Sequence, residues 1–375
     1  MWDIGNGLII STITIQLLRE RNLAILNNIF SWLVFIYLII VGVQISMTSI
    51  IWNQSLKDSF IAVRHQLYYL SLPLFLMTTN TPEKIRSFVK FLSLIGSIII
   101  LLSIINYFHP GIFYYKWTYG HGIRAGIKRA FIPGSNIICL LFCWYFSQYI
   151  LVYGTINLLW SFFCFFVIIF EQTRARIIGV TLVILISFLW SKKFKHLFSL
   201  LLLFIITINA ITIMTGKNIF FYNLQSTIQD ISHKQGNWAA RMKQMKVSWD
   251  LFKKHPWTGA AAFLRSAEPG TYKKYATIIA STDIGYMAWL KYYGILGTIW
   301  LFLLILIFYV KNFKLLKTVS LENLHIVYFN LMYFTFVILT FVTLNHFMKP
   351  YGIISVCFVL SNTIVLSALT KEPKD

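Results

Sequence analysis

The stretch Ile284–Tyr309, which reads IGYMAWLKYYGILGTIWLFLLILIFY, decides the fold class because it is long, apolar and almost free of charge. Roughly 17–25 consecutive apolar residues cross the hydrocarbon core of a bilayer as an α-helix. The apolar residues run continuously, without the alternation that a membrane β-barrel requires. The stretch therefore predicts a membrane-spanning helix.

The composition of the whole chain favours a multi-pass membrane protein. Of its 375 residues, 58% are hydrophobic and only 12% are charged, whereas a soluble domain carries about 25% charged residues. Apolar runs of sufficient length predict about eleven spans. They lie near 4–18, 28–50, 61–79, 87–107, 132–152, 155–171, 174–190, 197–215, 284–309, 325–345 and 352–369. We therefore predict an all-α, polytopic integral membrane protein.

One long polar segment divides the chain. We predict N-terminal transmembrane helices over 1–215, a large outer loop over 216–283 that contains a helix, and C-terminal transmembrane helices over 284–375. Together these regions form one membrane domain. The four cysteines lie in apolar runs without the spacing of a metal site, so we expect buried thiols and no metal.

The distribution of Lys and Arg predicts how the chain crosses the membrane. Short basic connections fall on one side of the predicted spans, at 19–21, 84–90, 192–195, 311–317 and 371–374. Because short basic loops stay in the cytoplasm, this side is expected to be cytoplasmic, with the N-terminus and the 216–283 loop on the outer side.

The outer side is also basic. The net charge is +21, and the connection 108–131 holds Lys116, Arg124, Lys128 and Arg129 without an acidic residue. In a soluble protein such a charge would suggest nucleic acid, which we do not expect for a membrane protein. Either the topology is mistaken or the loops are merely solvated, or the outer face binds a polyanion such as a lipid-linked phosphate or pyrophosphate.

A first motif, FEQTRARIIGV at Phe170–Val180, places charged residues between two apolar spans. Glu171, Arg174 and Arg176 lie there with almost no loop, and Arg174 should fall near the first turn of the next helix. The free N–H groups of a helix N-terminus, combined with an arginine, can bind an anion. The alternative is an interfacial arginine whose side chain reaches lipid headgroups.

A second motif, NWAARMKQMKVSWDLFKKHPWTG at Asn237–Gly259, predicts a helix inside the long loop that ends at Pro256 and Gly259. Apolar residues at helical spacing predict one apolar face: Met242, Met245, Trp249 and Phe252. Such a helix can rest on a membrane surface with its basic residues at the headgroups. This interpretation fits the four lysines of the motif better than it fits Arg241, at the beginning of the helix.

A third motif, STDIGYMAWLKYYGILG at Ser281–Gly297, opens the membrane helix described first. Thr282 and Asp283 are both competent N-cap residues, and capping alone would explain Asp283. Gly294 and Gly297 would allow close packing between helices.

Together, EQTRAR, RMKQMKVSWDLFKKHPWTG and DIGYMAWLKYYGILG resemble the motifs of the O-antigen ligase and polymerase superfamily of bacterial membranes. The resemblance covers residues 60–310. It implies a multi-spanning, metal-independent glycosyltransferase of the inner membrane that acts at the periplasmic face on undecaprenyl-pyrophosphate-linked glycans. By position in the family pattern, Arg174 and Arg241 match two arginines that are taken to engage the donor pyrophosphate.

The resemblance departs from the ligase pattern at Asp283. Ligases carry a His-Asn pair eleven residues before the first glycine of a closing GxxG, and this count from Gly294 reaches Asp283 and Ile284. An aspartate followed two residues later by glycine looks more like the polymerase branch, usually called Wzy. A polymerase is therefore implied and a ligase is the alternative. A lipid-linked oligosaccharide transporter ranks lower, because we find no pseudo-symmetry between the two halves of the chain.

The resemblance and the charge pattern together give a candidate site. The catalytic candidates are Arg174, Arg241 and Asp283. The candidates for binding pyrophosphate or glycan are Arg124, Lys128, Arg129, Arg176, Arg64 and Glu268. We expect no cofactor. The expected partners are undecaprenyl-pyrophosphate-linked donor and acceptor glycans, the lipid bilayer and a membrane protein that regulates chain length.

Overall fold

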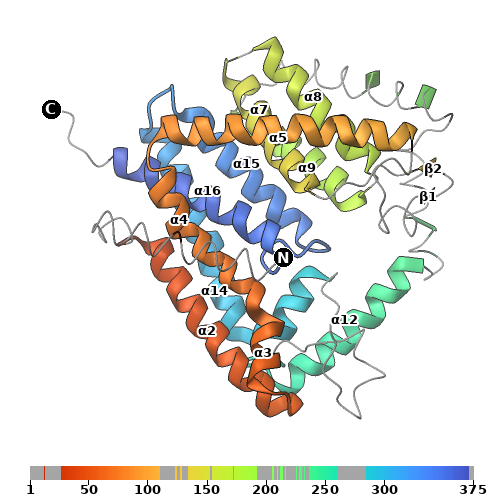
Figure 1. The fold of residues 1–375 in the computed structure, drawn as a ribbon, viewed down its shortest axis with the longest axis vertical. Coiled ribbons are helices and arrows are strands. Elements are labelled where there is room, and N and C mark those ends of the chain that lie inside the picture. Colours follow the sequence, from red (N-terminus) through yellow and green to blue (C-terminus); the bar gives the residue numbers. More distant parts are fainter. Residues whose placement is uncertain are drawn as a thin grey trace. The chain divides into compact units, whose positions relative to one another are not determined.

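The computed structural model describes most of the chain. The described residues are 27–109, 123–124, 127–128, 134–152, 154–171, 173–191, 236–260 and 284–370, with single residues or pairs at 12 and between 205 and 232. Figure 1 draws the helices and strands in the colours of the sequence. The chain divides into two units. The first unit comprises Met1–Lys84, Asn237–Val319 and Phe341–Asp375, and the second comprises Ile85–Gly236 and Ser320–Thr340.

The described residues are helical apart from one pair of two-residue strands, β1 (Ile123–Arg124) and β2 (Ile127–Lys128). Five described helices are long and apolar enough to cross a membrane: α2 (Ile29–Trp52), α5 (Pro82–Phe108), α9 (Arg174–Ser191), α14 (Gly285–Thr318) and α16 (Pro350–Leu369). Three shorter helices are also apolar: α7 (Ser135–Val152), α8 (Thr155–Phe170) and α15 (Leu324–Thr340). The prediction of a helical, multi-pass membrane protein is confirmed, whereas the count of eleven spans stays a prediction, with 4–18 and most of 197–215 outside the described residues.

The predicted third span, 61–79, is not one continuous α-helix. The chain forms α3 (Leu56–Val63), a 3₁₀ segment η2 (Arg64–Leu70) and α4 (Ser71–Thr78). Pro73 lies in the first turn of α4, where the N–H that proline lacks would have no helical partner. The polar pair Arg64 and His65 begins η2, so the break falls where the apolar run is interrupted in the sequence.

The first unit is organised around aromatic side chains of α2, η2 and α14. Tyr37 stacks on Trp300 with 4.2 Å between ring centroids, and Tyr69 and Trp289 contact the other sides of its ring. The indole N–H of Trp300 donates to the Leu33 carbonyl at 2.7 Å. These large side chains are almost fully buried, and their packing fixes α14 against α2.

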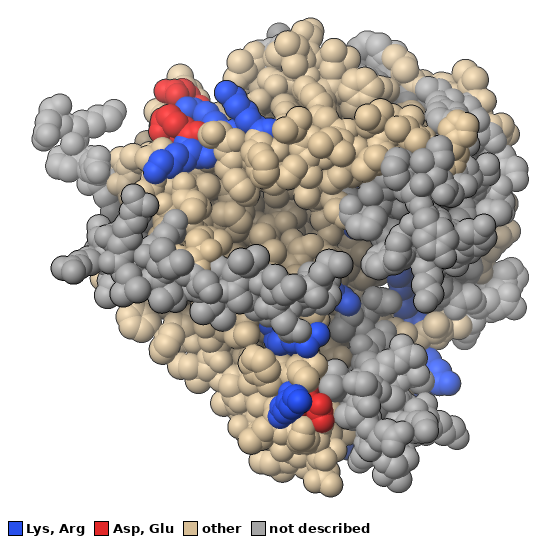
Figure 2. Space-filling view, viewed as in Figure 1, with Lys and Arg blue, Asp and Glu red and all other residues tan. Residues whose placement is uncertain are grey.

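The outward side of α2 is apolar, as expected for a helix in lipid. Trp32, Phe35, Ile39 and Ile50 are all exposed. Figure 2 shows that most of the described surface in view carries no charged side chain. Because lipid tails rather than water cover such surface, it does not conflict with a stable fold.

The second unit packs α15 against α7 and α9, with α8 beside α7. A Cβ added to Gly179 of α9 would lie 2.4 Å from the Thr340 methyl group of α15, so glycine allows these helices to approach closely. Most of α15 is buried, including Asn330 and Tyr333. This packing positions the beginning of α9, where the first motif lies.

The loop helix predicted from the second motif is α12 (Gly236–Lys254), which confirms its existence. The sequence did not predict which face of this helix packs against the protein. Three of the four predicted apolar positions, Met242, Met245 and Trp249, are exposed. The inward face consists of Val247, Ser248 and Leu251, and Val247 and Leu251 pack against a buried cluster at the end of α2. A narrow stripe of residues is enough for a helix to pack against the protein, so Met242, Met245 and Trp249 can contact another surface.

Candidate functional site

The first motif builds an internal charge network in the second unit. Glu171 lies between α8 and α9 and is fully buried, and its carboxylate pairs with Arg176 at 2.5 Å. The other terminal nitrogen of the Arg176 guanidinium donates to the side-chain oxygen of Asn136 on α7 at 2.8 Å. This network joins the α8–α9 connection to α7.

Arg174 is the first residue of α9, as predicted, and its side chain is partly buried. The Thr173 carbonyl accepts the backbone N–H groups of Arg176 at 2.9 Å and of Ile177 at 3.1 Å, which begins the helix. The Glu171–Arg176 pair lies on either side of this turn and holds it in place. Arg176 thus has partners inside the protein, and its predicted contact with substrate remains a prediction.

Arg241 lies in the second turn of α12, in the first unit. Its side chain is partly buried, whereas Lys243 and Lys246 are exposed. The sequence interpretation that separated Arg241 from these lysines agrees with this difference. Arg174 belongs to the second unit and Arg241 to the first.

The end of the second motif docks into a break in α14. At Gly294 the backbone has φ 60° and ψ −156°, and the helical path is interrupted. The N–H groups of Ile295 and Leu296 donate to the carbonyls of Pro256 at 2.9 Å and Trp257 at 3.2 Å. The predicted single helix is therefore two half-helices, and the loop supplies hydrogen bonds that the break would otherwise leave unmade.

Three more contacts hold the 256–260 segment. The N–H of Ala260 donates to the Lys291 carbonyl at 2.7 Å, and the Ala260 carbonyl accepts the indole N–H of Trp52 at 2.6 Å. The side-chain amide of Gln44 donates to the Thr258 carbonyl. The 256–260 segment thus bonds to α2 and to both halves of α14.

Two glycines allow the backbone of the 256–260 segment to approach the backbone of α14. A Cβ on Gly294 would lie 2.5 Å from the Trp257 carbonyl oxygen and 2.6 Å from that of Pro256. A Cβ on Gly259 would lie 2.5 Å from the Tyr292 carbonyl. Both positions also have positive φ, which only glycine adopts readily. The glycines of HPWTG and GILG therefore serve one interface.

Lys291 is a buried cation in the first half of α14 that sequence analysis did not select. Its side chain is 1% exposed, and its ammonium lies 4.2 Å from the centre of the Tyr292 ring. A signal was present, because Lys291 is the only charged residue in Ile284–Tyr309. A charged residue within a membrane helix is a candidate functional residue on physical grounds.

The beginning of α14 meets the turn that joins α15 to α16, residues 341–349, which we call the α15–α16 turn. A Cβ on Gly285 would collide with the Phe341 carbonyl, and Tyr286 contacts the Phe341 ring edge-on at 4.5 Å. Asp283 lies outside the described residues, and it precedes this junction by two positions in the chain.

The other predicted binding residues are only partly placed. Arg64 begins η2 and is partly buried. Arg124 lies in β1 and Lys128 in β2, and antiparallel pairing brings their backbones to adjacent rungs of one hairpin. Arg129 and Glu268 lie outside the described residues. The structure therefore tests none of these residues as ligands of the substrate.

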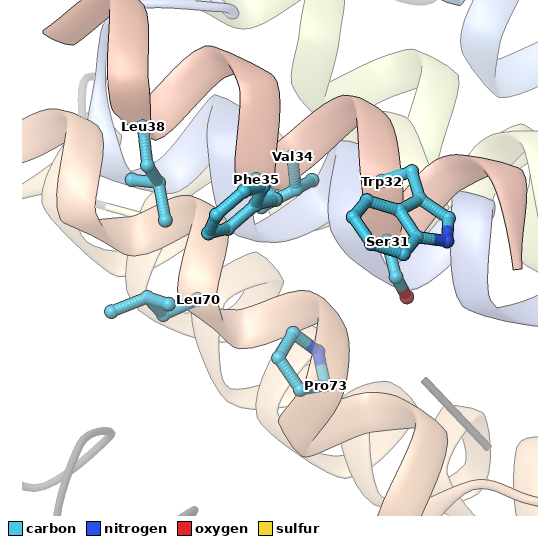
Figure 3. Close-up of a pocket in the computed structure, with 7 residues that line it drawn as sticks. All are labelled: Ser31, Trp32, Val34, Phe35, Leu38, Leu70 and Pro73. Atoms are coloured by element: carbon cyan, nitrogen blue, oxygen red, sulfur yellow. The ribbon is translucent and has the colours of Figure 1, made fainter. Parts of the chain in front are cut away.

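A groove between α2 and the η2–α4 segment has a volume of about 350 Å³. Figure 3 shows its lining, which is apolar except for the Ser31 hydroxyl and the Trp32 indole N–H: Ser31, Trp32, Val34, Phe35, Leu38, Leu70 and Pro73. It contains none of the predicted site residues. Without a cationic side chain its lining cannot neutralise a pyrophosphate, and it suits a hydrocarbon chain instead.

Among the described residues, no group of three or more His, Cys, Asp or Glu side chains could hold a metal ion. The four cysteines are buried free thiols, as predicted. The arrangement therefore offers cationic side chains, backbone N–H groups and amides as its means of binding an anion or a sugar.

Part of the chain is similar to a known family. No match was found among curated proteins. A family model described as O-antigen ligase matches residues 159–302, a range that contains Arg174, Arg241 and Asp283. This family implies an enzyme of the O-antigen ligase or polymerase type. The match confirms, for residues 159–302, the resemblance to the O-antigen ligase and polymerase superfamily that the three motifs indicate.

Proposed function

We propose that the protein polymerises undecaprenyl-pyrophosphate-linked oligosaccharide repeat units at the periplasmic face of the bacterial inner membrane. The observation that carries this proposal is the family match over 159–302, because it contains both candidate arginines and the candidate base. The identity of Asp283 favours a polymerase, since the ligase pattern has histidine at this position.

In the proposed reaction, a hydroxyl group of one lipid-linked repeat unit attacks the anomeric carbon of the growing chain. The bond between that carbon and the pyrophosphate oxygen breaks, and its electron pair leaves with undecaprenyl pyrophosphate. The hydroxyl proton passes to the Asp283 carboxylate and then to solvent. Pyrophosphate is a good leaving group, so positioning and charge neutralisation are the main demands on the enzyme.

Arg174 and Arg241 are the proposed pyrophosphate ligands. An arginine stays charged and can bind phosphate oxygens with two parallel hydrogen bonds. The Glu171–Arg176–Asn136 network supports this role for Arg174 because it fixes the turn from which Arg174 projects. The partial burial of Arg241 supports its role because a sheltered charge is screened less by water.

A ligase is the second candidate, because the matching family model carries the description O-antigen ligase. A ligase would use the same donor and transfer the finished glycan to lipid A-core or to a protein. The two arginines would then act on the same pyrophosphate. Only the acceptor and the group that activates it would differ.

Deletion of the gene distinguishes these activities. A strain that carries a single repeat unit on its final lipid acceptor indicates a lost polymerase. Long polymer that accumulates on the carrier lipid indicates a lost ligase, and repeat units retained on the cytoplasmic side indicate a lost transporter. Complementation with the wild-type gene must restore the original glycan, and either of the last two patterns would overturn the proposal.

A further inference from the structure

The α15–α16 turn is held rigidly within the first unit. The Tyr69 hydroxyl of η2 donates to the Phe347 carbonyl at 3.3 Å, and the Gln66 amide of η2 donates to the Met348 carbonyl at 3.4 Å. The ring of Phe347 also packs edge-on against Trp289 of α14, with 6.3 Å between centroids. A turn fixed by two neighbouring segments cannot easily rearrange to suit its own side chains.

Asn345 lies inside this turn, and no group of the described residues forms a hydrogen bond with its side-chain amide. Its side chain is 3% exposed, and neither its nitrogen nor its oxygen has a hydrogen-bond partner in the described part of the chain. Its backbone carbonyl, in contrast, accepts the N–H groups of Met348 at 3.1 Å and Lys349 at 2.9 Å. The turn therefore uses the backbone carbonyl of Asn345, but it forms no hydrogen bond with the side-chain nitrogen or oxygen.

A buried amide without hydrogen bonds is unfavourable unless a ligand or another group bonds to it. A buried polar group without a hydrogen bond destabilises the folded protein, and most such groups in proteins are satisfied. A second buried asparagine of the first unit shows the usual situation. Asn312 donates its side-chain N–H groups to the Phe308 carbonyl at 2.9 Å and to the Thr363 hydroxyl at 3.0 Å.

The chemistry of the amide selects the ligand. An asparagine side chain offers two donors and one acceptor and has no charge. A sugar hydroxyl both donates and accepts, so it can satisfy the amide oxygen and nitrogen together. A pyrophosphate has only acceptors and would oppose the amide oxygen with its own negative charge.

The position of the turn favours the acceptor glycan over the donor glycan as the ligand. The turn contacts the beginning of α14 through Phe341 and Gly285, and Asp283, the proposed base, precedes Gly285 by two residues. Asn345 lies outside the matched range 159–302, so the family model gives it no role. We propose that Asn345 binds a hydroxyl group of the acceptor glycan and orients it for attack, an inference that rests on the proposed transferase function.

The test compares Asn345→Leu with the matched control Asn312→Leu in purified protein. Leucine has a branched side chain like that of asparagine, but it is larger and has no amide. The donor is preformed lipid-linked polymer at saturation, and the varied acceptor is the single lipid-linked repeat unit that a strain lacking this gene accumulates. The thermal midpoint of unfolding in detergent is measured for each protein.

We expect Asn345→Leu to raise the KM for the acceptor at least tenfold and to keep or raise the thermal midpoint, because it removes two unsatisfied groups. Asn312→Leu should lower the midpoint and leave the KM unchanged. An unchanged KM in Asn345→Leu would overturn the inference. A lowered midpoint with activity reduced only in proportion to folded protein would assign Asn345 a structural role and overturn it as well.

Two controls keep the result interpretable. If Asn345→Leu does not accumulate, Asn345→Ala removes the same groups without adding volume, and the same KM criterion applies. If the wild-type protein forms no polymer from these substrates, the proposed function has failed rather than the role of Asn345.

Discussion

The backbone N–H of Ile295 donates to the carbonyl of Pro256 at 2.9 Å, which joins a membrane helix to a loop segment that precedes it in the chain. This bond lies where α14 is broken at Gly294. A broken helix inside a membrane is tolerated when other protein groups satisfy its free backbone. The Pro-x-x-Gly of the loop and the Gly-x-x-Gly of the helix are thus two parts of one structural element.

Gly294→Ala should destabilise the protein by about 1–3 kcal/mol or more, because alanine must adopt a backbone conformation that is nearly exclusive to glycine and its Cβ would collide with the 256–257 carbonyls. The matched control is Gly42→Ala on α2, where a Cβ would meet nothing within 4 Å. Alanine favours a helix by about 1 kcal/mol over glycine, so the control should be neutral or stabilising. Thermal unfolding in detergent measures both, and equal midpoints would contradict the prediction.

Glu171→Gln should destabilise the second unit, because it leaves the buried Arg176 cation without its counter-charge. Loss of one partner of a buried ion pair costs about 3–5 kcal/mol. The double variant Glu171→Leu with Arg176→Met removes both charges, and it should regain much of the lost stability. Protein abundance in the membrane and the unfolding midpoint report the effect. A single variant as stable as the wild type would show that the pair does not hold the α8–α9 connection.

Arg174→Ala should reduce polymer formation by about a hundredfold or more, which is typical for loss of one group that stabilises a transition-state charge. Arg174→Lys keeps the charge and loses the two-pronged geometry, so it should recover only part of the activity. The glycan ladder of complemented cells provides the measurement, with protein in the membrane quantified in parallel. A wild-type ladder from Arg174→Ala would remove this residue from the mechanism.

Arg241→Ala should have a similar effect, whereas Lys243→Ala should be close to neutral. The two residues lie on the same helix, but the Arg241 side chain is partly buried and Lys243 is exposed. This comparison separates a specific contact with the substrate from a general attraction to lipid headgroups. If both variants lose activity equally, the basic surface of α12 as a whole is responsible.

Asp283→Asn tests Asp283 as the proposed base, and the N-cap residue of α14 is Ile284 rather than Asp283. Asparagine is as good an N-cap as aspartate, so a residue needed only for capping would tolerate the change. A general base would not, because the amide cannot accept the hydroxyl proton. We expect normal abundance in the membrane and loss of the glycan ladder, and full activity would exclude Asp283 as the base.

Continuous apolar runs were the most informative feature of the sequence. They predicted α5, α7, α8, α9 and α16 closely, because length and hydropathy alone determine whether a segment can cross a bilayer. The same signal could not locate the break in α14. Gly294 interrupts the helix only because the 256–260 segment approaches it, and that contact depends on residues far from it in the chain.

Features of the candidate site that depend on neighbouring residues in the chain could be predicted. Contacts between different helices could not. The position of Arg174 at a helix start followed from the order of polar and apolar residues. The pairing of Arg176 with Glu171 and Asn136 did not, because Asn136 comes from another helix. The face of α12 that packs against the protein was not predictable for a related reason: Val247 and Leu251 pack against a cluster that includes Trp52, which is far from them in the chain.

The interlocking of the 256–260 segment with α14 has a consequence for protein engineering. A chimera with a related protein could be joined between residues 260 and 284, outside the helices that the structure describes. Such a junction would combine Gly294 from one parent with the 256–260 segment of the other. Exchange of 236–318 as a single cassette keeps both partners together, so it should preserve folding where the loop exchanged alone does not.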